Sequence, residues 1–285
     1  MSTYRREQKN LTVSRLPDHI SFDAAALLEP LSVAIHSLNR ASPTPGSTAL
    51  VIGAGTVGLL VAAMARQSGC TIVTIVDVDE GRVAYALDRG FATHGYVVPK
   101  PLHQSRSFSS IFTSGSTTPS SDGAMTPLST YGGGVSERLD YAKSVAADVL
   151  AVSAPDMQRE EDEDDGVDVT FECTGKEPCM QTALYATRPG GKVIMVGMGT
   201  PIQTVPLSAA HLREVDILGI FRYANTYKTG IRLLGASGRR GGLPSLDDMV
   251  THRFKGLGAA ARAFEIAGRT ADDEGRLVLK VVIEA

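Results

Sequence analysis

A glycine-rich turn between an apolar run and a helical stretch is the feature that most constrains the fold of this 285-residue chain. Residues 48–55 read TALVIGAG, a β-branched apolar run that ends in glycine, and Val57 to Gly69 then follow a helical pattern. Another apolar run, Thr71 to Val76, precedes a second helical pattern at Glu80 to Arg89. Strands and helices that alternate at this pace are typical of parallel βαβ units, so the sequence predicts an α/β fold with a doubly wound parallel sheet.

The same alternation continues after an interruption. Further strands are expected at 167–175, 190–199, 216–223 and 276–283, and helices at 22–40, 136–149, 180–187, 226–234 and 254–267. Pro30 must either kink the first of these helices or divide it in two. About two-thirds of residues 104–134 are Ser, Thr, Gly or Pro, and 160–165 is an acidic run. We therefore expect disordered loops at 103–135 and 155–166.

The glycines of Gly53-Ala-Gly55-Thr-Val-Gly58 stand where the dinucleotide-binding fingerprint of a Rossmann fold requires them. Gly53 permits the tight turn, Gly55 lets a pyrophosphate approach the backbone, and Gly58 lets the helix pack closely on the strand. Thr56 and Val57 open the helix, whose N-terminus then faces the phosphates. These residues are predicted to bind the cofactor, the alternative being a plain glycine turn.

An acidic residue at the end of the next strand favours NAD as that cofactor. Asp77 lies 24 residues after Gly53, where a carboxylate bonds both ribose hydroxyls of NAD and repels the 2′-phosphate of NADP. Arg82 follows five residues later, where it either bridges an NADP phosphate or, as is more usual, is a solvated helix residue.

Two further groups of residues are candidates for a site. Glu29 and His36 are about two helical turns apart and can share one face, although spacing alone favours a solvated Glu and a helix-face His. Arg222 and Tyr223 end a predicted strand, at the edge where parallel sheets collect ligands, or else the Arg packs over an aromatic ring. Thr174, in the run ECTG, belongs either to a cofactor-facing turn or to a plain strand end.

Composition excludes several classes of partner. Lys and Arg number 28 against 31 Asp and Glu, with no focused basic stretch, so nucleic acid is not expected. No apolar run is long enough to span a membrane and the N-terminus has no secretory signal. Three scattered Cys predict no disulfide framework and fit a reducing cytoplasm, and no Cys/His cluster has zinc-ligand spacing.

Several stretches together resemble one family: ALLEPLSVAIH, ALVIGAGTVGLL, VDVTFECTG, GGKVIMVGMG, IFRYANTY and VTHRF. They are similar to polyol dehydrogenases of the sorbitol, xylitol and arabinitol type, in the zinc-dependent medium-chain dehydrogenase superfamily. The resemblance covers 16–99 and 166–285. It implies oxidation of a secondary alcohol of a small-molecule polyol to a ketone with NAD, with zinc polarising the hydroxyl.

The resemblance also implies roles for single residues. Arg82 matches the family's basic residue beside the adenosine ribose, and Gly197 and Gly199 lie along the nicotinamide half. Arg222 and Tyr223 face the substrate. Glu29 matches the acidic residue that the family places beside its catalytic zinc, either as a zinc ligand or next to the ligands.

Compared with that family, the chain is expected to lack the catalytic domain that precedes the cofactor domain. We expect an N-terminal remnant and linking helix at 1–40, an NAD-binding domain at 41–249 and a catalytic-domain remnant at 250–285, whose apolar edge Leu277–Ile283 would be exposed. Zinc binding through Glu29 alone would be weak or absent. Three functions are considered: a dehydrogenase whose recorded sequence lacks its start, a non-catalytic NAD(H)-binding protein and, last, a zinc-free reductase. We also consider a homo-oligomer in which the strand at 216–223 is the edge that joins the copies.

Overall fold

The computed structural model describes residues 15–99, 134–156, 166–237 and 242–284, and its centre is a six-stranded parallel sheet. In spatial order the strands are β3 (His94–Val97), β2 (Ile72–Asp77), β1 (Thr48–Ile52), β4 (Val167–Glu172), β5 (Thr187–Met195) and β6 (Asp216–Gly219). The chain runs outward from β1 to β3 on one side and from β4 to β6 on the other. This is the doubly wound order, so the predicted fold is confirmed.

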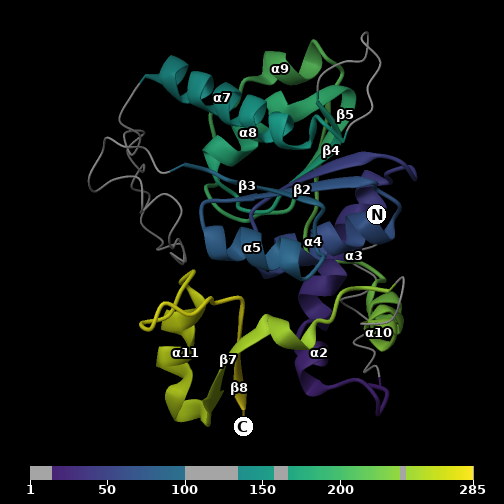
Figure 1. The fold of residues 1–285 in the computed structure, drawn as a ribbon, viewed down its shortest axis with the longest axis vertical. Helices are drawn as coiled ribbons and strands as arrows, with labels where there is room; N and C mark the ends of the chain where they lie inside the picture. Colours follow the sequence, from purple (N-terminus) through teal and green to yellow (C-terminus); the bar gives the residue numbers. More distant parts are fainter. Residues whose placement is uncertain (1–14, 100–133, 157–165, 238–241, 285) are drawn as a thin grey trace.

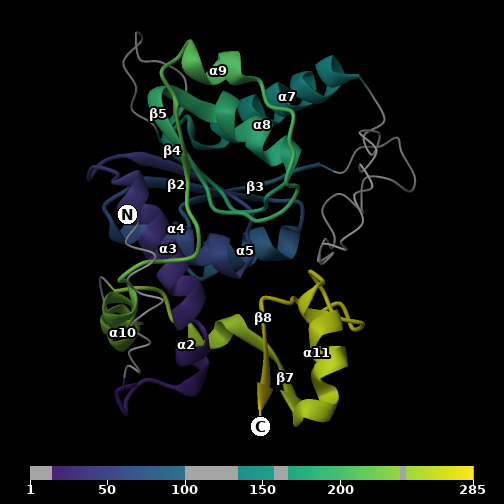
Figure 2. The same cartoon turned by 180° about the vertical axis from the view of Figure 1, so that it is seen from behind.

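Two layers of helices cover the sheet (Figures 1 and 2). One layer holds α3 (Leu28–Ala41), α4 (Thr56–Gln67) and α5 (Glu80–Asp88), and the other holds α7 (Val135–Ser153), α8 (Glu177–Ala186) and α9 (Leu207–His211). The inner strands are buried on both faces, which explains why β1 and β2 consist mostly of apolar residues. Helix α4 is buried from Gly58 to Ala65, so its apolar residues are not confined to one stripe.

Pro30 is accommodated by division of the predicted N-terminal helix. Helix α2 (Phe22–Ala26) ends before Leu27, and α3 begins at Leu28, so Pro30 is the third residue of the new helix. Proline is tolerated there because the first turn of a helix has no intrahelical acceptors for its N–H groups.

The C-terminal elements correct two of the predictions. After α10 (Tyr227–Ala236) and a short 3-10 turn, η1 (Asp247–Met249), the chain forms β7 (Val250–Lys255), η2 (Leu257–Ala259), α11 (Ala260–Ala267) and β8 (Lys280–Glu284). The helix expected at 254–267 is wrong at its start, because Phe254 and Lys255 pair with β8 and Gly256 turns at φ +73°. The expected exposed edge at 277–283 is wrong in part: β8 pairs with β7, and Val278 and Leu279 are buried.

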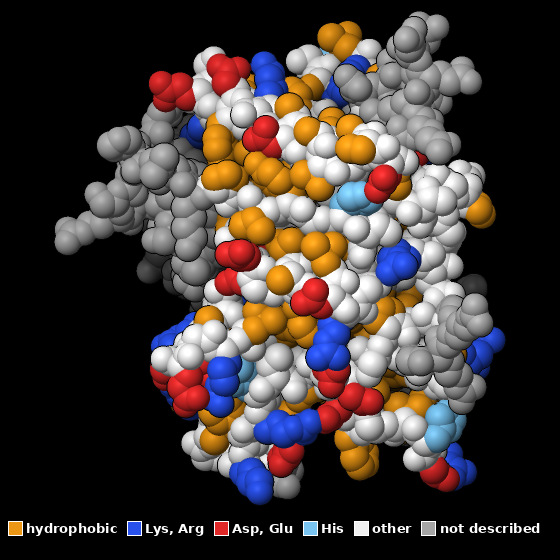
Figure 3. Space-filling view, viewed as in Figure 1, with side chains coloured by type: hydrophobic (Ala, Val, Ile, Leu, Met, Phe, Trp, Pro, Cys, Tyr) orange, Lys and Arg blue, Asp and Glu red, His pale blue; other side chains and the backbone are white. Residues whose placement is uncertain are grey.

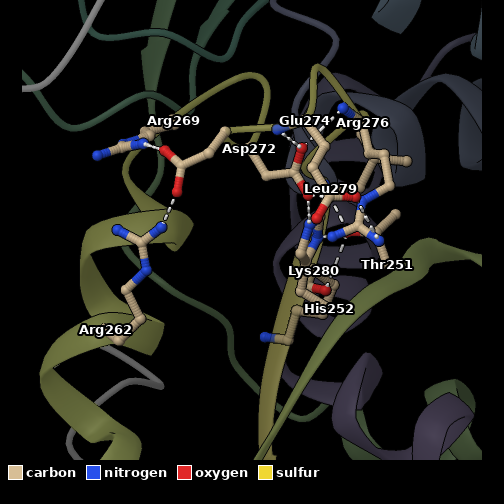
Figure 4. A network of polar contacts seen from close by, with 10 residues as sticks. Thr251, His252, Arg262, Arg269, Asp272, Glu274, Arg276, Leu279 and Lys280 are labelled. Atoms are coloured by element: carbon tan, nitrogen blue, oxygen red, sulfur yellow. Dashed lines mark hydrogen bonds and ion pairs between the residues drawn. The ribbon is translucent and has the colours of Figure 1, made fainter.

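A network of polar contacts stabilises the segment between α11 and β8 (Figure 4). The Asp272 carboxylate accepts hydrogen bonds from His252 Nε2 (3.1 Å), from Arg276 Nε (2.7 Å) and from the backbone N–H groups of Glu274 and Arg276. Around this segment, charged side chains of both signs lie close together on the lower part of the surface (Figure 3). These contacts fix a stretch of chain that has little regular secondary structure.

Two other segments differ from expectation. The strand predicted at 216–223 ends at Gly219, and β6 is indeed an edge of the sheet. Strand β3 was not predicted, because its four half-buried residues form no clear apolar run. The predicted loops at 103–135 and 155–166 lie almost entirely outside the described residues.

Candidate cofactor site

The turn between β1 and α4 has the geometry that the glycine spacing requires. Gly53 adopts φ +105° and its N–H donates to the Val76 carbonyl at 2.7 Å. A Cβ on Gly58 would lie 1.7 Å from the Gly53 carbonyl oxygen, so the helix and the turn are in backbone contact. At Gly55, by contrast, a Cβ would meet only Arg82 Nη1, at 3.9 Å. The side of the turn that a pyrophosphate would approach is therefore uncrowded, and the first N–H groups of α4 have no intrahelical acceptor.

Asp77 is tied to this turn by its own carboxylate. Its Oδ2 accepts the Ala54 N–H at 2.7 Å and its Oδ1 accepts the Asp79 N–H at 3.0 Å. Each carboxylate oxygen can accept more than one hydrogen bond, so capacity remains for ribose hydroxyls. The side chain is half-buried at the C-terminal end of β2, beside the glycine turn.

The segment from Arg269 to Leu279 reaches the glycine turn, which the sequence did not predict. Arg82 Nη2 donates to the carbonyl oxygens of Val278 (3.0 Å) and Arg269 (3.3 Å), and Thr56 Oγ1 donates to that of Leu279 (2.7 Å). Arg82 is thus not a solvated helix residue, because its guanidinium donates to two backbone carbonyls 187 and 196 residues away in the chain. Its Nη1 lies beside the glycine turn, 3.9 Å from the position of a Cβ on Gly55, and its contact with the cofactor stays a prediction. Backbone acceptors leave no signal in the sequence.

The turns that follow β4 and β5 lie against each other and against the first turn. A Cβ on Gly197 would lie 2.0 Å from the Gly175 nitrogen, and one on Gly199 would lie 2.2 Å from the Gly175 carbonyl oxygen. A Cβ on Gly53 would lie 2.9 Å from the Thr174 methyl carbon. The structure therefore brings the predicted residues from all three turns together at one edge of the sheet.

Two titratable side chains at the end of β4 have raised pKa values; Glu172 is buried and Cys173 is partly exposed. Burial raises the pKa of the Glu172 carboxyl, although hydrogen bonds from Thr174 and Gly175 act in the opposite direction. Burial also raises the pKa of the Cys173 thiol well above its usual value, and the neighbouring Glu172 adds to this effect. A thiol must ionise to act as a nucleophile or a metal ligand, so this shift disfavours both roles for Cys173.

Glu29 and Tyr223, predicted from separate motifs, meet through Tyr227. The hydroxyls of Tyr223 and Tyr227 are 3.3 Å apart. The pKa of Tyr227 is raised by burial, by the contact with Tyr223 and by the nearby Glu29 carboxylate. Sequence reasoning missed Tyr227, which begins α10 four residues after Tyr223 and is brought beside it by the turn between them.

Among the residues that the structure describes, no hydrogen bond or ion pair joins Arg222 or His36 to that group. Arg222 has φ +51° in the turn after β6, and its guanidinium carbon lies 5.8 Å from the ring centre of Phe221. This matches the alternative of an Arg over an aromatic ring, in a turn rather than on a strand. His36 is half-buried, and burial, followed by the charge of Arg40, lowers its pKa.

The described residues do not fit a zinc ion. Within 15–99, 134–156, 166–237 and 242–284 no three or more His, Cys, Asp or Glu side chains come together as a metal site. Glu29 is exposed, and its carboxylate lies near Tyr227. We therefore assign no zinc site to these residues. Within the same ranges, no helix has the length and apolarity needed to cross a membrane.

Comparison with known proteins identifies relatives of this chain. The profile of the zinc-binding dehydrogenase family matches residues 133–236. Sorbitol dehydrogenase of Arabidopsis thaliana is 34% identical over 84% of the chain and 51% of its own length, and L-idonate 5-dehydrogenase of Vitis vinifera is 33% identical over the same shares. A solved structure of an Escherichia coli oxidoreductase of unknown specificity has a TM-score of 0.65 at 25% identity, over 94% of this chain and 59% of the other.

The chain thus spans about half the length of the relatives named above. The fold agrees with that of a solved oxidoreductase. The chain belongs to the zinc-dependent medium-chain dehydrogenase superfamily, as a relative of its sorbitol and L-idonate dehydrogenases.

Proposed function

We propose that this chain binds NAD(H) along the C-terminal edge of its six-stranded sheet and serves the NAD-dependent oxidation of a polyol secondary alcohol to a ketone. The observation that carries the proposal is the uncrowded glycine turn at Gly53–Gly58, with the Asp77 carboxylate fixed beside it. The names of the sorbitol and L-idonate dehydrogenases support the substrate class. Bound NAD would supply a nicotinamide ring that accepts a hydride from the carbon bearing the hydroxyl.

Each group of residues has a separate task in this proposal. The N-terminus of α4 binds the pyrophosphate, and Asp77 accepts the adenosine ribose hydroxyls and repels the 2′-phosphate of NADP. Thr174, Gly197 and Gly199 line the nicotinamide half. Arg222, Tyr223 and Glu29 lie on the substrate side.

A second candidate is an NAD(H)-binding protein without dehydrogenase activity. The observation that favours it is that the described residues bring no set of zinc ligands together. Incubation of the purified chain with sorbitol or xylitol and NAD, with zinc analysis of the same sample, separates the two candidates. Turnover at ordinary enzyme rates supports the dehydrogenase, and cofactor binding without turnover supports the second candidate.

Cofactor binding itself is tested by titration with NADH, followed by nicotinamide fluorescence. We expect saturable binding of NADH that is tighter than that of NADPH. Asp77→Asn should weaken NADH binding and reduce the difference in affinity between NADH and NADPH, since the repulsion of the 2′-phosphate is lost. Asp88→Asn, on the exposed face of α5, is the matched control and should change neither. A chain that binds neither cofactor would contradict the proposal.

The proposed cofactor site also suggests how the chain divides into domains and how two copies could associate. We propose residues 41–249 as the cofactor-binding domain, with 1–40 and 250–285 flanking it, and a homo-oligomer joined through the β6 edge. The free edge of β6 supports this association, because an unpaired strand edge can pair with a second copy. Sedimentation velocity of the chain, compared with a variant carrying Ile217→Pro, tests it. A monomer in both samples would contradict it.

A further inference from the structure

The buried carboxylate of Glu172 is the point at which the turns after β4 and β5 are joined. The side chain stands at the end of β4, is only 2% exposed, and turns into the protein. Its Oε1 accepts the Thr174 N–H at 2.7 Å and also the Thr174 hydroxyl, and its Oε2 accepts the Gly175 N–H at 2.9 Å. One carboxylate thus satisfies three donors of a single turn.

The backbone of the same residue holds the other turn. The carbonyl oxygen of Glu172 accepts the N–H groups of Val196 and Gly197, each at 2.8 Å. The Gly175 carbonyl then accepts the Thr200 N–H at 3.1 Å, so the two turns are linked a second time. Because they are in backbone contact at Gly197, a movement of the Thr174–Gly175 turn must displace the segment after β5 as well.

These two turns lie on one side of the point where the strand order reverses, between β1 and β4. A dinucleotide bound across such a point places one mononucleotide over β1 and β2 and the other over β4 and β5. The glycine turn and Asp77 belong to the first half. The turns held by Glu172 belong to the second.

From this geometry, and on the basis of the proposed binding of NAD(H), we infer that Glu172 is a positioning residue for the nicotinamide half of the cofactor site. Its carboxylate is used up by bonds within the turn, so it acts through the backbone on which the nicotinamide ring lies. Glu172→Gln keeps the size of the side chain but places an amide NH₂ against a backbone N–H donor. The turn should loosen while the glycine turn and Asp77 stay in place.

The test compares NADH with ADP-ribose, which lacks the nicotinamide ring, by isothermal titration calorimetry on the whole chain. In Glu172→Gln we expect NADH to bind about tenfold more weakly, equivalent to about 1.4 kcal/mol, while the affinity for ADP-ribose is unchanged. Glu177→Gln is the matched control: Glu177 is also buried and also accepts a backbone N–H, from Thr204, near the start of α9. Among the described residues it accepts no hydrogen bond from Thr174, Gly175, Val196 or Gly197. This variant should leave both affinities unchanged.

A milder variant protects the test against loss of folding. Thr174→Val removes one donor to Glu172 and leaves the carboxylate in place, so it should shift NADH affinity in the same direction by a smaller factor. Equal weakening of both ligands, or of neither, in the two variants would overturn the inference. If the unsubstituted chain binds ADP-ribose but not NADH, the inference fails while the first half of the cofactor site stands. If it binds neither ligand, the proposed function fails and the inference with it.

Discussion

Replacement of Gly58 by alanine tests the contact on which the whole glycine turn depends. The added Cβ would lie 1.7 Å from the Gly53 carbonyl oxygen and 2.9 Å from the Gly53 carbonyl carbon. Contacts of a Cβ below 3.0 Å essentially do not occur, so helix and turn must separate by about 1.3 Å. The obstacle is backbone, which cannot rotate aside as a flexible side chain does.

The size of the effect follows from the packing around that contact. Helix α4 is buried from Gly58 to Ala65, so a shift of this helix disturbs its packing against the sheet along its length. Overpacking of a well-packed core typically costs about 1–3 kcal/mol, and an obstruction by backbone should lie at or above the top of that range. Against a total stability of about 5–15 kcal/mol, the loss is large but need not prevent folding.

Urea unfolding followed by far-UV circular dichroism measures this loss, and the chain contains no Trp that would offer a fluorescence signal. Gly219→Ala is the matched control, because a Cβ at Gly219 would meet no atom within 4 Å. That variant should stay within about 0.5 kcal/mol of the original chain. NADH titration of both variants gives a second readout, in which Gly58→Ala should lose at least about tenfold in affinity, or 1.4 kcal/mol.

The reasoning would be refuted by a Gly58→Ala chain that unfolds at the same urea concentration as Gly219→Ala and binds NADH equally well. In that case the turn would open with little loss of free energy of unfolding. Close contact between helix and strand would then not explain why the third position of the motif, Gly58, is a glycine. A loss of stability with unchanged NADH affinity would show that the turn can be displaced without harm to the cofactor site.

Three further outcomes are expected. Burial alone would raise the pKa of Asp168, but hydrogen bonds from Thr48 and Arg188 lower it overall. The carboxylate therefore stabilises the fold above its unfolded pKa of about 3.9, and this stabilisation is lost as the pH falls through the folded pKa. Asp168→Asn should therefore flatten the acid side of a plot of urea midpoint against pH; an unchanged slope would contradict this. Arg82→Met should raise the rate of amide hydrogen exchange in β7 and β8 but not in β1, since two hydrogen bonds to backbone carbonyls are lost. An equal change of the exchange rate in all three strands would contradict this prediction. The Cys173 thiol is partly exposed but has a raised pKa, so it should react with maleimide at neutral pH more slowly in the folded chain than in urea. Equal labelling rates in the folded and unfolded chain would contradict this.

The sequence by itself predicted those parts of the protein in which the signal is local. The apolar run of β1, the glycines after it and the acid at the end of β2 lie within 30 residues of one another, and each has a spacing that only a few structures satisfy. The alternation of strands and helices then predicted the layers and the parallel sheet, because a buried parallel strand requires apolar residues on both faces. The position of Asp77 beside the glycine turn could be foreseen for the same reason.

What the tertiary structure alone decided are contacts between distant segments that end on backbone atoms. Arg82 donates to carbonyl oxygens of residues 187 and 196 positions away, which nothing in its sequence surroundings indicates. The carboxylate of Glu172 accepts hydrogen bonds from backbone N–H groups, which every residue except proline carries. Strand β8 pairs with β7 in the same way, through backbone groups. Backbone donors and acceptors are the same at almost every position, so no residue type marks these partners, and only the folded arrangement of the chain selects them.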